Sequence, residues 1–507
     1  MIALPAVKFV GFVVFVLPQT GIPEQREPLT CRKREGAVDP RIESMSQSLS
    51  RYFLYSNPRF DFTIDGELSA APGFFRFGPD IICYGRSSKG LLSDNPVQQL
   101  YDVSDHVRLD NGRVVLPFDP EEIIGNLRSE RYAAHCAQYA SSRGLIRDAY
   151  YLVRPLLPLA VRKYLQRIYL RGWENMQFPK WPVDRTVDRL FQELVILALK
   201  ATESESIPFI WFWPNGANAC AIMTHDVEAL PGKRFCSQLM DLDSSFGIPA
   251  SFQIVPEKRY SVETEFLEEI RRRGFEVNVQ DLNHDGNLFR DEAEFERRVK
   301  KINDYGREYQ AAGFRSAILY RNQEWFDLLE FEYDMSVPSV AHLDPQGGGC
   351  CTMMPYFVGE LVELPVTTTQ DHSLFNVLDD CTMTLWNQQA ELILKHHGLM
   401  NFIVHPDYIL GERAQSTYKS LLRSLVRSRE EHGVWVALPR DVSRWWRQRD
   451  RMVLTHKGEN WSVEGNGSEK ARVAFATLQG DQLVYSFADQ QVNAMPVTRE
   501  FSRWEYV

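Results

Sequence analysis

Two carboxylates and a histidine stand at the end of a short apolar run in the middle of the chain. The run Ala219–Met223 leads through Thr224 into His225, Asp226 and, two residues later, Glu228. In an extended strand residues i and i+2 point to the same side, so the two carboxylates share one face and the histidine lies on the other. A carboxylate pair at the end of a buried strand suits a metal ligand and a general base.

Further polar groups follow other short apolar runs downstream. They are Gln280, Asp281, His284 and Asp285 after 275–279; Arg315, Tyr320 and Arg321 after Gly313; Asp334 after Phe331; and His405 after 401–404. In parallel α/β sheets and barrels, ligands and catalytic groups gather at the carboxyl ends of the strands. The sequence therefore predicts one site that several strands supply.

The elements that must position these side chains alternate along the chain. Between residues 207 and 438 short apolar strands alternate with amphipathic helices, which predicts an α/β fold with a parallel sheet or barrel. Residues 51–120 read as a small β-rich region, with a strand expected at Arg51–Tyr55 and a hairpin turn at Asp110–Arg113. Residues 121–203 read as helical, and a β-hairpin is expected in the tail.

These patterns predict four parts of the chain. Residues 1–50 are expected to be a disordered leader and linker, and 51–203 a β-rich and then helical region. Residues 204–453 are expected to form the (β/α) barrel, and 454–507 a small C-terminal β-unit.

Composition excludes several classes of protein. The 507 residues are 44% apolar and 24% charged with a net charge of −10, so the chain is globular and an unlikely partner for nucleic acid. The eight cysteines include no CxxC, which excludes zinc fingers and indicates reduced, buried thiols. The apolar segment at Met1–Leu17 is too short for an integral membrane span. It leaves export open beside the cytoplasmic location that we expect, and it is also typical of a misassigned start.

With these residues laid out, the region 207–440 resembles the polysaccharide deacetylase superfamily, the NodB-homology or carbohydrate esterase family 4 group. The segments that carry the resemblance are Thr224–Glu228, Gly274–His284, Gly313–Arg315, Tyr333–Ser336, Glu363–Phe375 and Ile403–Pro406. The family's fold is a distorted (β/α) barrel of seven strands. Its members remove acetyl groups, usually from N-acetylated glycans.

The resemblance implies a role for each matching residue. Asp226 would be the general base and also a metal ligand, together with Glu228 and His284, and Arg315 would be the group that orients the base. His405 would be the acid that protonates the leaving amine. We also expect Tyr320, Arg321 and Asp334 to bind the substrate. The cofactor implied is a divalent metal, zinc first, and the partner implied is a glycan or N-acetylated sugar.

The chain departs from the family at Gln280, which stands where the first histidine of the metal-binding His-x3-His is normal. A neutral amide is a poor zinc ligand. His225, Asp281 and Asp285 are candidate substitutes, and such an oxygen-rich set would favour manganese or magnesium. The alternatives are a carbohydrate-binding relative without metal or catalysis, and hydrolysis of a non-glycan amide on the same barrel.

Overall fold

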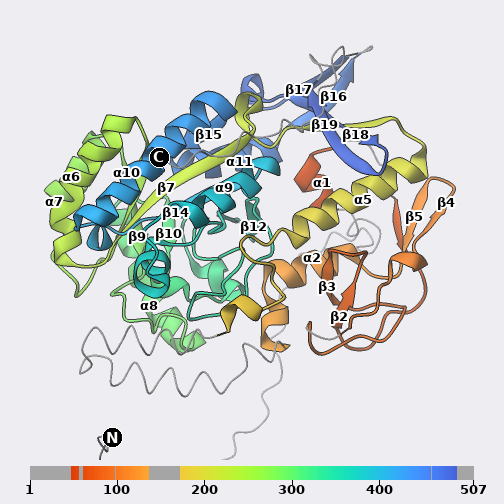
Figure 1. Ribbon diagram of the computed structural model, residues 1–507, viewed down its shortest axis with the longest axis horizontal. Helices are drawn as coiled ribbons and strands as arrows, with labels where there is room; N and C mark the ends of the chain where they lie inside the picture. The colour runs from red at the N-terminus through yellow and green to blue at the C-terminus, as the bar shows by residue number, and fades with distance from the viewer. Residues whose placement is uncertain (1–46, 56–60, 97–98, 136–171, 458–459, 488–507) are drawn as a thin grey trace, which may run out of the picture. The chain divides into compact units, whose positions relative to one another are not determined.

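The structure is a computed structural model that describes residues 47–55, 61–96, 99–135, 172–457 and 460–487 (Figure 1). The expected leader at 1–50 lies almost wholly outside this part. No helix within it is long and apolar enough to cross a membrane. The six cysteines described there are all unpaired, and five of them are buried, as their spacing indicated.

A nine-stranded sheet occupies the centre of the region expected to be a barrel. Its strands are β12 (Tyr356–Val358), β13 (Leu361–Glu363), β11 (Tyr333–Asp334), β10 (Gly313–Arg315), β9 (Glu276–Gln280), β8 (Ala250–Ile254), β7 (Ala219–Val227) and β14 (Leu399–Ile403) in spatial order, with β15 (Val434–Ala437) also paired to β7. All pairs are parallel except β12 with β13. The predicted α/β class is confirmed, while the expected count of seven strands is not exact.

Side chains join the two ends of this curled sheet where no strand pairing does so. Thr367 Oγ1 donates to the Leu399 carbonyl at 2.6 Å, and Thr368 Oγ1 donates to the Asn401 carbonyl at 2.7 Å. Asn401 Nδ2 donates to the Leu364 carbonyl at 3.0 Å. The segment after β13 is thereby held against β14, which gives the distorted closure that the deacetylase resemblance implied.

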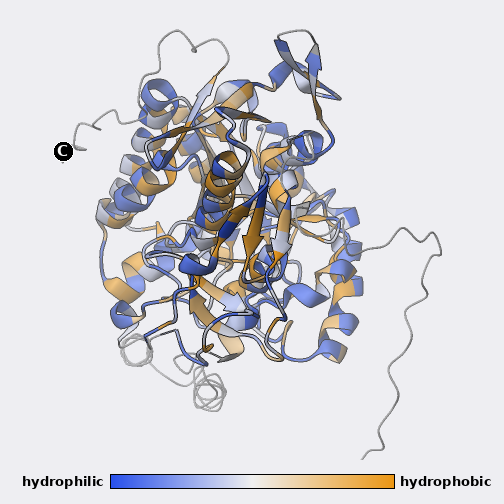
Figure 2. Cartoon of the chain, turned by 90° about the vertical axis from the view of Figure 1, so that its right-hand side faces the viewer, coloured by the Kyte–Doolittle hydropathy of each residue, from blue (hydrophilic) through white to orange (hydrophobic). Residues whose placement is uncertain are grey.

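Helices lie between strands of the sheet along the chain, and the last of them follows the final strand. They are α6 (Leu230–Phe246), α7 (Thr264–Arg272), α8 (Glu292–Glu308), α9 (Thr384–Lys395), α10 (Glu412–His432) and α11 (Pro439–Asp450). Asp291 caps α8 by accepting from the Glu294 N–H at 2.9 Å, and Gly247 ends α6 with a φ of 62°. Figure 2 shows hydrophobic residues gathered in the central strands and mixed character on the helices around them.

The region before the barrel is small and mixed. It contains α1 (Gln47–Phe53), β1 (Phe62–Ile64), β2 (Gly73–Arg76), β3 (Ile82–Gly85), β4 (Arg108–Asp110), β5 (Arg113–Leu116), α2 (Pro120–Arg128) and α5 (Thr186–Thr202). The turn between β4 and β5 is the expected one, with Asn111 at a φ of 48° and Gly112 at 85°. The strand expected at Arg51–Tyr55 is wrong: most of it belongs to α1, where Tyr52 packs on Phe191 of α5. Tertiary packing has overridden the β-propensity of its aromatic residues.

The segment that enters the barrel and the segment that leaves it share a sheet. β6 (Ser206–Ile210) pairs antiparallel with β18 (Val473–Gln479), which forms the expected hairpin with β19 (Gln482–Phe487). β16 (Val453–Lys457) pairs with β17 (Asn460–Glu464) beside it. The boundaries at 204 and 454 stay predictions, and this sheet spans both of them.

Arg449 of α11 binds two other backbone segments from inside the core. It is 1% exposed, and its guanidinium donates to the carbonyls of Trp211 at 3.0 Å, Ile210 at 2.6 Å and Tyr52 at 2.8 Å. Burial lowers the pKa of this arginine to about 9. The helix after the last barrel strand is thereby fastened to β6 and to the end of α1.

Replacing Arg449 with Met is expected to destabilise the protein by about 3 kcal/mol or more, because several buried carbonyls lose a charged donor while the volume is kept. Urea unfolding followed by circular dichroism measures the effect. The matched control is Arg451→Met on the exposed side of the same helix end, which should change stability by no more than about 0.5 kcal/mol. Equal effects of the two substitutions would contradict the assignment.

Candidate active site

The Asp226 carboxylate lies inside the barrel near the carboxyl end of β7 and is held from three sides. Oδ1 accepts from Arg315 Nη1 at 2.7 Å and from Gln253 Nε2 at 3.4 Å. Oδ2 accepts from Gln280 Nε2 at 3.1 Å. Arg315 is fully buried and also donates to Thr224 Oγ1 at 2.7 Å. A buried carboxylate with one guanidinium and two amide donors is fixed in orientation, as a general base requires.

His405 follows β14 and faces Asp226 across the barrel mouth. Its Nδ1 lies 2.5 Å from Asp371 Oδ1, and its backbone N–H donates to Asp371 Oδ2 at 2.8 Å. Its Nε2 is 4.0 Å from Asp226 Oδ2. Burial lowers the pKa of His405, but the carboxylates of Asp371 and Glu228 outweigh burial and hold the pKa well above its usual value. The ring therefore carries a proton that Nε2 can donate.

Glu228 lies between two imidazole rings. Its Oε1 is 2.7 Å from His284 Nε2 and 3.4 Å from His405 Nε2. The first contact lacks the alignment of a hydrogen bond, since His284 Nε2 has no hydrogen-bond partner. Burial raises the pKa of Glu228, but the two histidines more than offset it and leave the pKa well below normal. Asp407 shapes the turn here by accepting from the Glu228 N–H at 3.1 Å and the Gly232 N–H at 2.8 Å.

The structure thus brings together six of the residues singled out in the sequence. They are Asp226, Glu228, Gln280, His284, Arg315 and His405, on β7, β9, β10 and the segments after β7, β9 and β14. Each lies at or just past the carboxyl end of its strand. The alternation of strands and helices in the sequence predicted this location. Their assignment to catalytic and metal-binding roles stays a prediction.

Two of the three other candidate ligands make contacts away from this cluster, while Asp281 lies close enough to His284 to interact with it electrostatically and has its Oδ2 buried without a hydrogen-bond partner. His225 faces the opposite side of β7, as strand alternation predicted, with Nδ1 2.9 Å from the Val404 carbonyl and Nε2 3.0 Å from Asp243 Oδ2. Asp281 is fully buried at a φ of 51° and accepts from the Leu282 N–H at 2.6 Å. Asp285 forms a two-pronged ion pair with Arg298, at 2.7 Å and 2.9 Å.

The three residues expected to bind substrate are buried. Asp334 accepts from Ser336 Oγ at 2.7 Å inside the barrel. Arg321 pairs with Glu130 of the N-terminal region, with Nε 2.7 Å from Glu130 Oε2. Tyr320 is 8% exposed and packs near Gly286, beside the His284 loop. All three make contacts within the protein, and their role toward substrate stays a prediction.

The sequence reasoning missed a chain of hydrogen bonds that runs through the barrel interior from Asp226. Gln253 Nε2 donates to Asp226, and Gln253 Oε1 accepts from Asn278 Nδ2 at 3.3 Å. Asn278 Nδ2 also donates to Tyr333 Oη at 2.8 Å, and the Tyr333 hydroxyl donates to Glu276 Oε1 at 2.6 Å. The signal was present: Glu276, Asn278 and Gln280 alternate with valines along β9, so that one face of a buried strand is polar.

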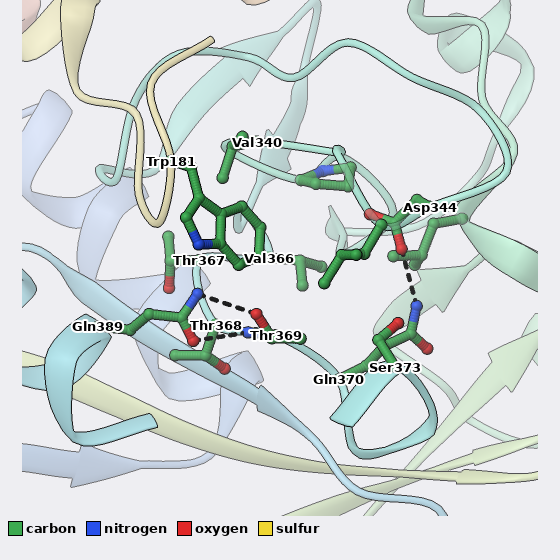
Figure 3. Close-up of a pocket in the computed structure, with 13 residues that line it drawn as sticks. Trp181, Val340, Asp344, Val366, Thr367, Thr368, Thr369, Gln370, Ser373 and Gln389 are labelled. Atoms are coloured by element: carbon green, nitrogen blue, oxygen red, sulfur yellow. Dashed lines mark hydrogen bonds between the residues drawn. The ribbon is translucent and has the colours of Figure 1, made fainter. Parts of the chain in front are cut away.

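A small cavity lies beside the loop that carries Asp371 (Figure 3). Its volume is about 20 Å³, room for one water or one methyl group. Leu319 and Val366 on its wall pack with Ile403, two residues before His405. Trp181 lines another side, and Gln370 Nε2 donates to Asp344 Oδ1 at 2.9 Å. The cavity is thus close along the chain to both members of the His405–Asp371 pair.

The side chains present do not fit the three-ligand metal site that the resemblance implies. Gln280 turns its donor nitrogen to Asp226, and its Oε1 is buried without a partner. Glu228 Oε1 and His284 Nε2 are 2.7 Å apart, whereas two ligand atoms on one tetrahedral zinc ion are roughly 3.4 Å apart. Across the described ranges, no group of three or more His, Cys, Asp and Glu side chains is arranged to hold a metal ion.

Comparisons with known proteins find likeness at the level of structure. A scan against protein-family models gives no match, and neither does a search of curated proteins. A Mycobacterium smegmatis protein described as a polysaccharide deacetylase is 17% identical, with 50% of this chain and 98% of that chain covered and a TM-score of 0.40. The chain resembles polysaccharide deacetylases.

Two further solved structures are similar to the chain. Peptidoglycan deacetylase PdaC from Bacillus subtilis is 12% identical, with 46% of this chain and 93% of that chain covered and a TM-score of 0.30. PuuE allantoinase is 14% identical, with coverage of 46% and 92% and a TM-score of 0.33. At these identities and TM-scores the likeness says nothing about activity, substrate or metal.

Glu276, at the far end of the hydrogen-bond chain, gives a test of the buried network. Burial raises the pKa of Glu276 from 4.5 to about 7, so the folded protein retains a proton that the unfolded chain loses. Its contribution to stability is complete below about pH 4.5 and is lost as pH rises through about 7. Glu276→Gln stays neutral at every pH. The variant should therefore gain on the order of 3 kcal/mol relative to the native protein between pH 4.5 and 8.

Urea unfolding of both proteins at several pH values in this interval measures that difference. Other titrating groups are common to the two proteins and cancel in the comparison. A stability difference that does not change with pH would show that Glu276 is ionised in the folded state, contrary to the assignment.

Proposed function

We propose that the chain is an amide hydrolase of the deacetylase type that removes the acetyl group from an N-acetylated sugar or glycan. One observation carries the proposal: a base and an acid face each other in one buried cluster. Asp226 is fixed by Arg315, His405 is fixed by Asp371, and Asp226 Oδ2 and His405 Nε2 are 4.0 Å apart. That arrangement suits cleavage of a bond that needs one proton removed and one supplied.

In the proposed reaction Asp226 takes a proton from a water molecule, whose oxygen attacks the acyl carbon of the amide. His405 gives the proton on Nε2 to the amide nitrogen as the carbon–nitrogen bond breaks. The products are acetate and a free amine on the sugar. Arg315 keeps Asp226 oriented without taking its place, because the guanidinium is held by Thr224 Oγ1 and by the Met335 carbonyl at 3.0 Å.

A metal-dependent form of this reaction was the first expectation from the sequence, and the family's metal would polarise the carbonyl and activate the water. Glu228 and His284 would hold it. Since their present contact and the amide of Gln280 do not fit such a site, we derive the steps from Asp226 and His405 alone. The same observation favours a second candidate, a carbohydrate-binding relative without catalysis.

Substitution of either member of the pair should remove activity. We expect Asp226→Asn and His405→Asn each to lower kcat/KM for an N-acetylated glycan by roughly 10²–10⁴. Acetate release from a glycan panel measures it. His456→Asn in the C-terminal β-unit is the matched control and should keep native turnover, since His456 is exposed and its ring contacts Trp461. Equal turnover of the native protein and both site variants would refute the proposed roles.

Gln280→His separates the two candidate functions. Elemental analysis after dialysis against zinc, manganese or magnesium gives the metal content, and acetate release gives the activity. A native protein that holds no metal and turns over glycan supports the hydrolase as derived. An inert native protein that acquires metal and activity with Gln280→His supports the binding relative. A native protein that retains one metal, lost with His284→Ala, would contradict our interpretation of the ligand set.

A further inference from the structure

A second cavity opens at the opposite end of the barrel from Asp226. It has a volume of about 130 Å³ and lies at the amino-terminal ends of β9 and β10. Its walls are formed by Arg271, Glu276, Val277, Gln310, Ala312, Arg440 and Arg444. β9 spans the distance between the two sites, with Glu276 at the cavity and Gln280 on Asp226, roughly 13 Å apart along the strand.

Positive charge dominates the walls of this cavity. Three of its seven residues are arginines, from the end of α7 and the first turns of α11, and Glu276 is its single carboxylate. Arg444 has a carboxylate near it, with Nε 3.8 Å from Glu332. The guanidinium of Arg271 donates to the Tyr309 carbonyl at 2.5 Å, which brings no negative charge. Like charges that line one small volume repel each other unless an anion lies between them.

Arg440 supplies an independent sign of a missing acceptor. Its Nε is buried and has no hydrogen-bond partner, although its backbone N–H donates to Glu276 Oε2 at 3.2 Å. A buried N–H without an acceptor costs about 1–3 kcal/mol, and such groups are rare in folded proteins. A bound anion with several oxygen atoms would satisfy this donor and the charge around it.

We infer that this cavity is a binding site for a small oxyanion, namely a phosphate group. Guanidinium groups donate in parallel pairs to phosphate oxygens, and three of them around one volume suit a tetrahedral anion better than a planar carboxylate. Gln310 adds an uncharged donor at the rim. The site is distinct from the Asp226 cluster and does not depend on the proposed hydrolysis.

Glu276 links the new site to the proposed active site. One of its oxygens accepts from the Arg440 backbone at the cavity, and the other accepts from Tyr333 in the hydrogen-bond chain that ends on Asp226. An anion in the cavity therefore acts electrostatically on the first member of a buried network whose last member is the proposed base.

Isothermal titration of the full chain with inorganic phosphate at constant ionic strength tests the inference. We expect one phosphate per chain, with a dissociation constant on the order of 1 mM or tighter. Arg440→Ala and Arg444→Ala should each weaken binding at least about fivefold. Arg444 is exposed, so its variant is expected to fold even if the Arg440 variant does not, and circular dichroism checks both.

Arg272→Ala is the matched control, because Arg272 neighbours Arg271 on α7 but is exposed and lies outside the cavity. It should bind phosphate as the native protein does. Three results would overturn the inference: no saturable phosphate binding, an equal loss with Arg272→Ala, or acetate binding as tightly as phosphate.

Discussion

The buried ion pair between Asp226 and Arg315 is the constraint on which the rest of the barrel depends. A single guanidinium contacts β7 through Thr224 and Asp226 and the end of β11 through the Met335 carbonyl. It can do so only if β7, β10 and β11 keep their order and register. Removing one partner of such a pair costs about 3–5 kcal/mol, because a charge is left buried alone. The same ion pair therefore requires correct assembly of the sheet and fixes the orientation of the proposed base.

The interior of the barrel is polar where most protein cores are apolar. Glu276, Asn278 and Gln280 present amides and a carboxyl along one face of β9, while Val277 and Val279 pack outward against helices. Asn278 Nδ2 donates in both directions, toward Gln253 and toward Tyr333, and a carboxyl group accepts at each end of the chain. Because every link is buried and oriented, the network favours one arrangement of its side chains over any other.

The sequence predicted which residues lie close together in the candidate site. It predicted fewer of the contacts that each of them makes. Strand alternation placed Asp226 and Glu228 together and turned His225 away, because local geometry decides such directions. Arg321 and Tyr320 could not be placed in the same way. They follow Ile318 and Leu319, whose positive φ angles of 62° and 56° redirect the chain, and no apolar pattern announces that turn. The partner of Arg321, Glu130, lies 191 residues away.

Gln280 shows most clearly how far a residue's role can be predicted from sequence. The residue type alone indicated that Gln280 replaces a metal ligand. In the structure its side chain donates a hydrogen bond to Asp226. That contact follows from the three-dimensional position of Asp226, which the sequence does not give. The strand predicted at Arg51–Tyr55 failed for the opposite reason, since its aromatic residues are used in helix packing against α5. Local sequence patterns predict side-chain positions well where a single strand determines them. They fail where contacts between distant segments determine them.

The pairing of β6 with β18 has a consequence for how the protein is made. Ile210 is paired with Val473, so the strand that precedes the barrel waits for a partner encoded roughly 260 residues later. At typical rates of translation this interval is roughly 15 to 50 seconds. Throughout that time the nascent chain carries an unpaired apolar strand edge, with Ile207, Phe209 and Ile210 among its residues. The ribosome-bound intermediate, more than the finished protein, therefore exposes an apolar strand edge to other chains.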